Sequence, residues 1–228
     1  MFKKLKQEYK IPDDCQIKGL DEIYKSELGY IKNGTFVEVG AYDGARWSNT
    51  SFLADLGWNG IYIEPVKEYY EMCVLRHKKN KNINVLNLAV GEEECDTKIY
   101  VGKGLSTISK EHLEFYKKSN FSKHVNFSGS EYCKQKRLEN ILEDYKIDKF
   151  FELLVVDVEG YESEVFNSLN LSYWEPKIMI VELPDENKHF TEFTTYLNKI
   201  KKLRKKIHNA GYKEIYMDDI NTVFKKFN

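Results

Sequence analysis

Apolar residues recur along the chain in two patterns, one typical of helices and the other of buried strands. Apolar side chains spaced three or four positions apart, as from Leu20 to Ile31, predict helices because they fall on one helical face. Near-continuous apolar runs, such as the one from Leu153 to Val156, predict strands that are buried on both faces. The predicted helices span residues 20–31, 50–56, 66–77 and 191–209, and the predicted strands span residues 35–39, 60–63, 83–90, 152–158, 177–183, 212–217 and 222–227. This alternation predicts an α/β fold with a mostly parallel sheet and helices on both faces.

The last two predicted strands differ from the others in how they are connected. Only a short polar turn, residues 218–221, lies between residues 212–217 and 222–227. Two strands joined by so short a turn pair in antiparallel fashion. We therefore expect the sheet to finish with a C-terminal antiparallel hairpin, which is an arrangement found in many Rossmann-like methyltransferases.

Length and composition limit the classes of protein that need to be considered. The chain has 228 residues, which suits one domain of about 100–200 residues with a small appendage. We expect a single domain over residues 1–228, with a helical N-terminal extension at residues 1–34 and a substrate-facing insertion or lid at residues 102–136, the least regular part of the sequence. The sequence gives no indication of the oligomeric state.

Charge and hydropathy exclude several partners. Lys and Arg number 35 and Asp and Glu number 36, so the net charge is −1 and a general nucleic-acid binder is not expected. No run reaches the roughly 20 apolar residues that a membrane span needs, and no apolar segment follows the N-terminal lysines. We therefore predict a cytoplasmic protein without a membrane span.

Common catalytic and metal-binding motifs do not occur. The four cysteines, at positions 15, 73, 95 and 133, form no CxxC pair, which excludes zinc-ribbon and thioredoxin-like arrangements. The sequence also contains no HExxH, GxSxG or Walker A motif. Metalloprotease, α/β-hydrolase and P-loop functions are therefore not indicated.

Acidic residues follow most of the predicted strands at their carboxyl ends, where open α/β sheets bind ligands. They are Glu38 and Asp43 around the first turn, Glu64 after the second strand, Asp157 and Glu159 after the fourth, and Glu182 at the end of the fifth. One such acid could simply cap a helix. A whole row of them indicates a ligand that carries positive charge.

The first turn, GAYDG at residues 40–44, lacks the complete GxGxxG pattern of a dinucleotide site. Its flanking carboxylates would repel a pyrophosphate, but they suit a ligand with a sulfonium and an ammonium group. Glu64 lies 26 positions (64 − 38) after Glu38, close to the spacing at which an acid binds ribose hydroxyls. S-adenosylmethionine has the ribose and both cations, whereas NAD has the ribose and the unsuitable phosphates.

Several motifs in a fixed order resemble one known family. They are FVEVGAYDG at residues 36–44, SNT at 48–50, GWNG at 57–60, IEP at 63–65 and DVEGYE at 157–162. Together, over residues 35–185, they resemble the FkbM-type S-adenosylmethionine-dependent methyltransferases. The resemblance implies a seven-stranded Rossmann-like sheet and methylation of a hydroxyl group on a sugar, a glycan or a related metabolite.

The resemblance also implies which residues bind the cofactor. Those expected under its methionine part are Glu38, Gly40, Asp43 and Gly44; Glu64 is expected at the ribose, and Ala89 and Val90 at the adenine. Ala41, Pro65 and Asp157 are further candidates for cofactor binding. Ser48 and Asn49 would either contact the cofactor carboxylate or cap the following helix. Tyr42 stands where many members have Asn, so a polar contact from that side chain is not carried over.

The acids after the fourth strand are the candidate catalytic groups. Methyl transfer to a hydroxyl oxygen needs a base for the hydroxyl proton, and Asp157 is the first candidate and Glu159 the second. Asp157 could instead only bind the cofactor or cap a helix. Alternatively, Asp157, Glu159 and Glu182 could hold Mg²⁺, which would orient two substrate hydroxyls and lower the pKa of one.

Other functions remain open at this point. The same cofactor could serve an RNA ribose or a protein side chain as acceptor, although the near-zero net charge argues against nucleic acid. A non-catalytic interaction protein could have kept the fold, but it would not need the whole row of acids. A nicotinamide-dependent oxidoreductase is the weakest alternative. The leading hypothesis is an O-methyltransferase that acts on a small-molecule or glycan acceptor.

Overall fold

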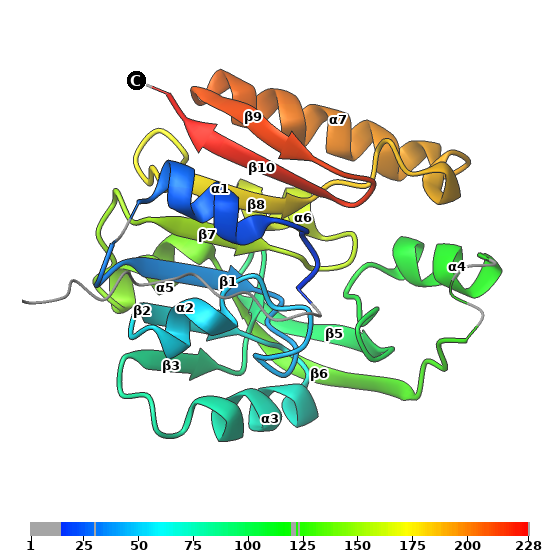
Figure 1. The fold of residues 1–228 in the computed structure, drawn as a ribbon. Helices are drawn as coiled ribbons and strands as arrows, with labels where there is room; N and C mark the ends of the chain where they lie inside the picture. The colour runs from blue at the N-terminus through cyan, green and yellow to red at the C-terminus, as the bar shows by residue number, and fades with distance from the viewer. Residues whose placement is uncertain (1–14, 30, 120–121, 123, 228) are drawn as a thin grey trace, which may run out of the picture.

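A seven-stranded sheet runs through the protein, with its C-terminal hairpin at one edge (Figure 1). The computed structural model describes residues 15–29, 31–119, 122 and 124–227. In sheet order the strands are β3 (Ile83–Leu86), β2 (Asn59–Ile63), β1 (Thr35–Val39), β7 (Leu153–Val156), β8 (Ile178–Glu182), β10 (Asn221–Lys226) and β9 (Tyr212–Met217). Strand β10 pairs in antiparallel fashion with both β8 and β9, and all the other strand pairs of this sheet are parallel. The predicted α/β sheet, mostly parallel with a C-terminal antiparallel hairpin, is confirmed.

The central strands end level with one another. Val39, the last residue of β1, pairs with Ile63 on β2 and with Val156 on β7. Val156 in turn pairs with Val181 on β8. Because these strands are parallel, their carboxyl ends meet at one edge of the sheet, and the residues that follow them lie close together.

Helices cover both faces of the sheet, as predicted. On one face, Phe36, Tyr62 and Val155 pack with α1 (Leu20–Glu27) and α2 (Ser51–Asp55). On the other face, Val37, Leu154 and Met179 pack with α5 (Leu138–Asp144), α6 (Glu162–Asn167) and α7 (Thr194–Asn209). Helix α3 (Lys67–His77) follows β2, and the 3₁₀ helix η1 (Lys188–Phe190) precedes α7. Successive strand residues point to opposite faces, so two separate apolar cores sandwich the sheet.

A second, three-stranded sheet lies beside the carboxyl ends of the first (Figure 1). It has the order β4 (Ala89–Val90), β6 (Gly129–Lys136), β5 (Cys95–Val101). The prediction of a single strand over residues 83–90 is therefore wrong, because this segment forms β3 in the main sheet and β4 in the second sheet. Between its halves, the Asn87 amide donates to the backbone oxygens of Glu64 and Pro65, at 3.0 and 2.9 Å, and turns the chain away from β2.

The segment at residues 102–136 is more regular than its sequence indicated. It contains α4 (Lys110–Lys118) and all of β6. Strands β5 and β6 were not predicted because one face of each is exposed to solvent, and inward-facing residues such as Ile99 and Cys133 are too few to form an apolar run.

The expected N-terminal extension lies partly outside the described residues, which begin at Cys15. Its described part is integrated into the core, since Ile17, Leu20 and Tyr24 are fully buried. Among the described helices, none combines the length and the apolar character that a membrane crossing requires.

Candidate active site

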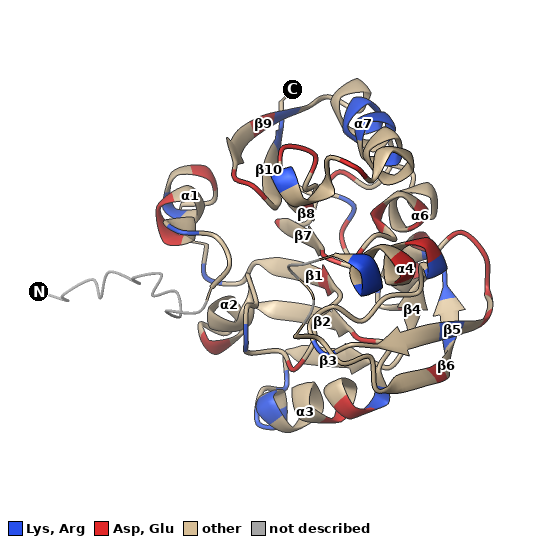
Figure 2. Ribbon diagram, turned by 90° about the vertical axis from the view of Figure 1, so that its right-hand side faces the viewer, with Lys and Arg blue, Asp and Glu red and all other residues tan. Residues whose placement is uncertain are grey.

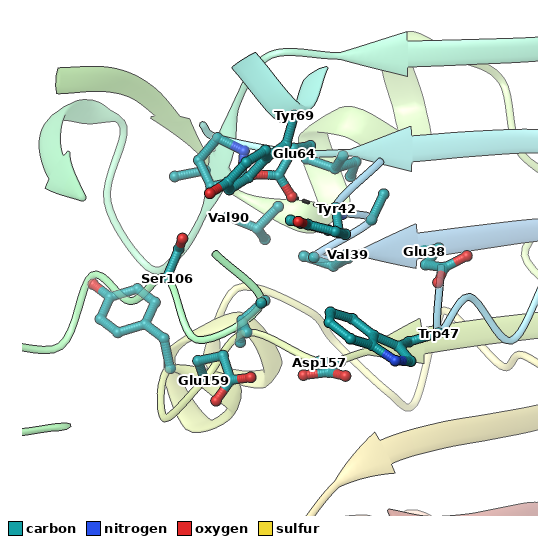
Figure 3. A pocket seen from close by; sticks show the side chains of 18 of the residues that line it. Glu38, Val39, Tyr42, Trp47, Glu64, Tyr69, Val90, Ser106, Asp157 and Glu159 are labelled. Carbon is teal, nitrogen blue, oxygen red and sulfur yellow. Dashed lines mark hydrogen bonds between the residues drawn. The ribbon is translucent and has the colours of Figure 1, made fainter. Parts of the chain in front are cut away.

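A cleft opens between the carboxyl ends of the main sheet and the segment that connects β5 to α4 (Figure 3). The open space inside it, including the solvent-filled mouth, is about 840 Å³. The sequence-predicted residues that line it are Glu38, Gly40, Ala41, Ser48, Asn49, Glu64, Pro65, Ala89, Val90, Asp157 and Glu159. Asp43, Gly44 and Glu182 are not among the lining residues.

Gly40 lets the ends of β1 and β7 approach each other. Its φ is +89°, and a Cβ atom placed on it would lie 1.7 Å from the backbone oxygen of Asp157. The Asp157 N–H donates to the backbone oxygen of Val39 at 3.0 Å, which extends the β1–β7 pairing to this point. Only glycine fits here, and the close approach brings the Asp157 side chain to the cleft.

Asp43 and Gly44 hold the turn rather than lining the cleft. The Asp43 carboxylate accepts hydrogen bonds from the backbone N–H groups of Ala45 and Arg46, at 2.9 and 2.8 Å. Gly44 has φ +70°, and a Cβ atom on it would lie 2.5 Å from the Cys73 sulfur. Both residues therefore fix the path of the β1–α2 loop, and most of the other residues of this loop line the cleft.

Glu38 is buried at the base of this loop. It accepts hydrogen bonds from the hydroxyls of Ser48, at 3.0 Å, and of Thr50. Burial raises the pKa of Glu38 to about 7, although these hydrogen bonds oppose the rise. The carboxyl group can therefore gain or lose a proton near neutral pH.

Ser48 and Asn49 support the start of α2 and also face the cleft. The Ser48 hydroxyl accepts from the Ser51 N–H at 3.0 Å, in agreement with the capping interpretation. Asn49 is buried, and its backbone oxygen accepts from the Tyr24 hydroxyl at 2.9 Å. Since both residues line the cleft as well, the two interpretations of the SNT motif are compatible.

Glu64, at the end of β2, faces the opposite side of the cleft from Asp157 (Figure 3). Its two carboxylate oxygens accept from the N–H groups of Tyr42 and Val66, both at 2.8 Å. A carboxylate oxygen accepts two hydrogen bonds, so each retains capacity for one more donor. Burial raises the pKa of Glu64 to about 8.

Asp157, Glu159 and Glu182 bring their carboxylates together, each offering an oxygen within 4.8 Å of the others. Gln16 donates from Nε2 to Asp157 at 3.0 Å, and the Tyr116 hydroxyl donates to Glu159. Burial raises the pKa of all three groups, and their mutual repulsion raises that of Glu159 and Glu182 further.

Several cleft residues were not predicted from the sequence, and the most prominent are aromatic. Tyr42 and Trp47 both adopt left-handed backbone conformations, and their rings stack with 5.6 Å between the ring centroids. The ring centroids of Tyr69 and Tyr42 are 4.5 Å apart, and Trp47, which is 44% exposed, lines the same cleft as Asp157 (Figure 3). The sequence signal that could have indicated Tyr42 and Trp47 is the presence of aromatic residues within a glycine-bearing loop. Tyr69 lies on α3, outside that loop.

The strand order, with one antiparallel strand, and the cleft at the strand ends define the class of this protein as a Rossmann-like methyltransferase. The O-methyltransferase from Bacillus cereus in complex with SAH is similar in structure, with a TM-score of 0.52 and 10% identity over 94% of this chain and 84% of that chain. Precorrin-6y C5,15-methyltransferase from Geobacter metallireducens GS-15 has a TM-score of 0.47 and 7% identity over 96% of this chain and 92% of that chain.

The sequence places the protein more narrowly within this class. The family described as "Methyltransferase FkbM domain" matches residues 38–214, and the chain belongs to this family. The match includes all of β2, β3, β7 and β8, together with the end of β1 and the start of β9, and it stops before β10. No curated protein matches the chain significantly.

Proposed function

We propose that the protein transfers the methyl group of S-adenosylmethionine to a hydroxyl oxygen of a sugar, a glycan or a related metabolite. The observation that carries this proposal is that a single cleft brings together Glu38, Glu64 and Asp157. These acids suit the ammonium group, the ribose and the sulfonium of that cofactor. Membership of a methyltransferase family supports the same reaction.

The cofactor would lie across the ends of β1 and β2. Its methionine part would lie near Glu38, Gly40 and Asp157, and its ribose hydroxyls would donate to the free lone pairs of Glu64. The buried residues Ala89 and Val90, which line the cleft, would contact the adenine. Pro65, Ala41 and the Ser48-Asn49 pair would complete this binding surface.

The reaction is an in-line displacement. The cofactor, when bound, would supply the methyl group: its carbon–sulfur bond would break with the electron pair left on sulfur, as in S-adenosylhomocysteine, and the acceptor oxygen would form the new bond to carbon. The acceptor's hydroxyl proton passes to a carboxylate, for which Asp157 is the first candidate and Glu159 the second. Burial raises the pKa of both carboxyl groups, so each is a stronger proton acceptor than an exposed carboxylate whenever it is ionised.

The acceptor would approach from the side of the segment at residues 102–136. Lys103, Gly104 and Ser106 line the cleft from this segment, which supports its role as the substrate-facing insertion. Acidic and basic residues are mixed on α1, α3 and α4, whereas α7 carries Lys and Arg and no acidic residue (Figure 2). The net charge of −1 favours a small or glycan acceptor over a nucleic acid, whose phosphates require a basic surface. A cytoplasmic location remains a prediction.

Calorimetric titration with S-adenosylmethionine and S-adenosylhomocysteine tests the cofactor, with NAD as the negative control. We expect both sulfur compounds to bind, and Glu64→Gln to weaken them at least tenfold by removing the charged acceptor for the ribose hydroxyls. Glu68→Gln, an exposed site on α3, is the matched control and should bind normally. Absence of binding by the folded wild-type protein would overturn the proposal. Sugar acceptors are then screened for methyl incorporation.

A further inference from the structure

The geometry points to a divalent-cation site, of the Mg²⁺ and Mn²⁺ class, formed by Asp157, Glu159 and Glu182 beside the cleft. Binding of the ion is independent of the proposed function, whereas its role toward the acceptor rests on that function. The site would bind an ion through carboxylate oxygens alone, and hard cations prefer such ligands.

The three carboxylates converge because of the sheet and one bend of the backbone. Val156 and Val181 are paired, so Asp157, directly after β7, lies level with Glu182, the last residue of β8. Glu159 has a left-handed φ of +53°, which turns the chain back toward the strand ends. The side chains of Asp157 and Glu182, at the ends of β7 and β8, therefore meet the side chain of Glu159, which lies in the loop after β7.

The spacing of the oxygens fits one ion. Magnesium and calcium bind oxygen at about 2.0–2.6 Å, so two ligands of one ion lie roughly 3–5 Å apart. The three carboxylates each offer an oxygen within 4.8 Å of the others. Small side-chain movements would complete the coordination of Mg²⁺ or Mn²⁺.

The charge of the cluster is not balanced by the protein's own cations. None of the ion pairs formed by the described residues includes Asp157, Glu159 or Glu182. Gln16 and the Tyr116 hydroxyl, which donate to the cluster, are neutral, and Asp157 and Glu182 also interact through a side-chain hydrogen bond. Three carboxylates so close together need either a bound cation or shared protons.

Glu182 provides a second, independent observation. Its side chain is buried, with 8% of the residue's surface exposed, and its Oε2 atom has no hydrogen-bond partner among the described residues. A buried carboxylate oxygen without a partner is costly. A cation among the three carboxylates would supply the missing interaction.

The position of the site indicates what kind of acceptor it would serve. Asp157 and Glu159 also line the cleft, so the coordination positions that the protein leaves open would face the acceptor. An ion there would hold two neighbouring oxygen atoms of one substrate and lower the pKa of a bound hydroxyl. The acceptor class that fits is a vicinal diol, of the kind that sugars carry.

Metal binding can be measured without any turnover. The full chain is treated with EDTA, the chelator is removed, and Mn²⁺ is titrated with electron paramagnetic resonance as the readout and with Mg²⁺ as competitor. We expect one Mn²⁺ per chain, displaced by Mg²⁺, and at least tenfold weaker binding in Glu182→Gln. Glu186→Gln, an exposed site on the following loop, is the matched control and should bind as the wild type does.

A comparison of the two variants already introduced separates this proposal from the proposed function. Glu64→Gln should lose S-adenosylmethionine affinity and keep Mn²⁺ affinity, and Glu182→Gln should show the reverse. Wild-type protein that binds S-adenosylmethionine but no Mn²⁺ at millimolar concentration would overturn the metal site alone, and would leave shared protons as the explanation of the cluster. Mn²⁺ binding without cofactor binding would overturn the proposed function alone. If Glu182→Gln does not fold, Glu159→Gln, which changes another member of the cluster and no residue assigned to the cofactor, replaces it.

Discussion

The backbone oxygen of Asp157 occupies the place where a side chain on Gly40 would begin, with 1.7 Å between that oxygen and an added Cβ atom. This contact joins the first turn to the acids after β7. It makes the two halves of the cleft a single rigid unit.

Gly40→Ala should therefore both destabilise the protein and abolish cofactor binding. The added methyl must push β1 and β7 apart, and we expect a loss of at least about 3 kcal/mol from overpacking and left-handed strain. Thermal unfolding would then begin roughly 6–12 °C lower. Gly57→Ala is the matched control, since Gly57 has the same φ of +89° but nothing within 4 Å of an added Cβ. Equal losses in the two variants would show that the steric contact is unimportant.

Cofactor affinity should increase with pH between 6 and 7.5. Burial raises the pKa of Glu38 to about 7 and that of Glu64 to about 8, so both are substantially protonated at pH 6. The ammonium and ribose hydroxyls bind the ionised forms, and binding therefore releases protons, which raises the affinity by up to about tenfold per pH unit for each proton released. Calorimetry in two buffers of different ionisation enthalpy counts these protons. An affinity that does not change with pH would contradict the assignment.

Stability should change with pH in the opposite direction. Glu38, Glu64 and Glu162 have folded-state pKa values of about 7, 8 and 7, all raised from 4.5 by burial. The folded state therefore binds more protons than the unfolded state between pH 4.5 and about 8, and the free energy of unfolding falls as pH rises through this range. Melting temperatures between pH 6 and 8.5 should decline by several degrees. The decline should be smaller in Glu64→Gln, and a rising melting temperature would refute the prediction.

Asp157→Asn distinguishes a catalytic role from a binding role. If Asp157 removes the acceptor proton, turnover should fall about 10²–10⁴-fold while S-adenosylmethionine affinity changes little. The measurement is kcat alongside the cofactor Kd, with Glu159→Gln treated in the same way. Equal losses of turnover and affinity would make Asp157 a binding residue.

The main sheet could be predicted from the sequence because its central strands are buried on both faces. Runs such as Leu153–Val156 carry that information locally, and the short turn after Met217 identifies the hairpin. Strands β5 and β6 could not be predicted, since their exposed faces interrupt any apolar run. The division between β3 and β4 depends on the Asn87 amide, a contact that periodicity does not encode.

The acids of the cleft could be predicted because parallel strands bring their carboxyl ends together. Contacts between residues that are far apart in the sequence could not be predicted. Gln16 reaches Asp157 across 141 positions of sequence, and Trp47 packs over Gly104, where an added Cβ would lie 2.7 Å from its ring. Asp43 and Gly44 match the family motif, yet the structure explains them through the turn that they stabilise.

The Asn87 amide has a consequence for how the cleft could respond to an acceptor. One side chain holds the backbone oxygens of both Glu64 and Pro65, and it lies two residues before the second sheet begins. A displacement of that sheet, which carries the acceptor-facing segment, would pull on the backbone next to the acid that is expected to bind the ribose. Acceptor binding and cofactor binding would in that case be energetically coupled through a single amide group.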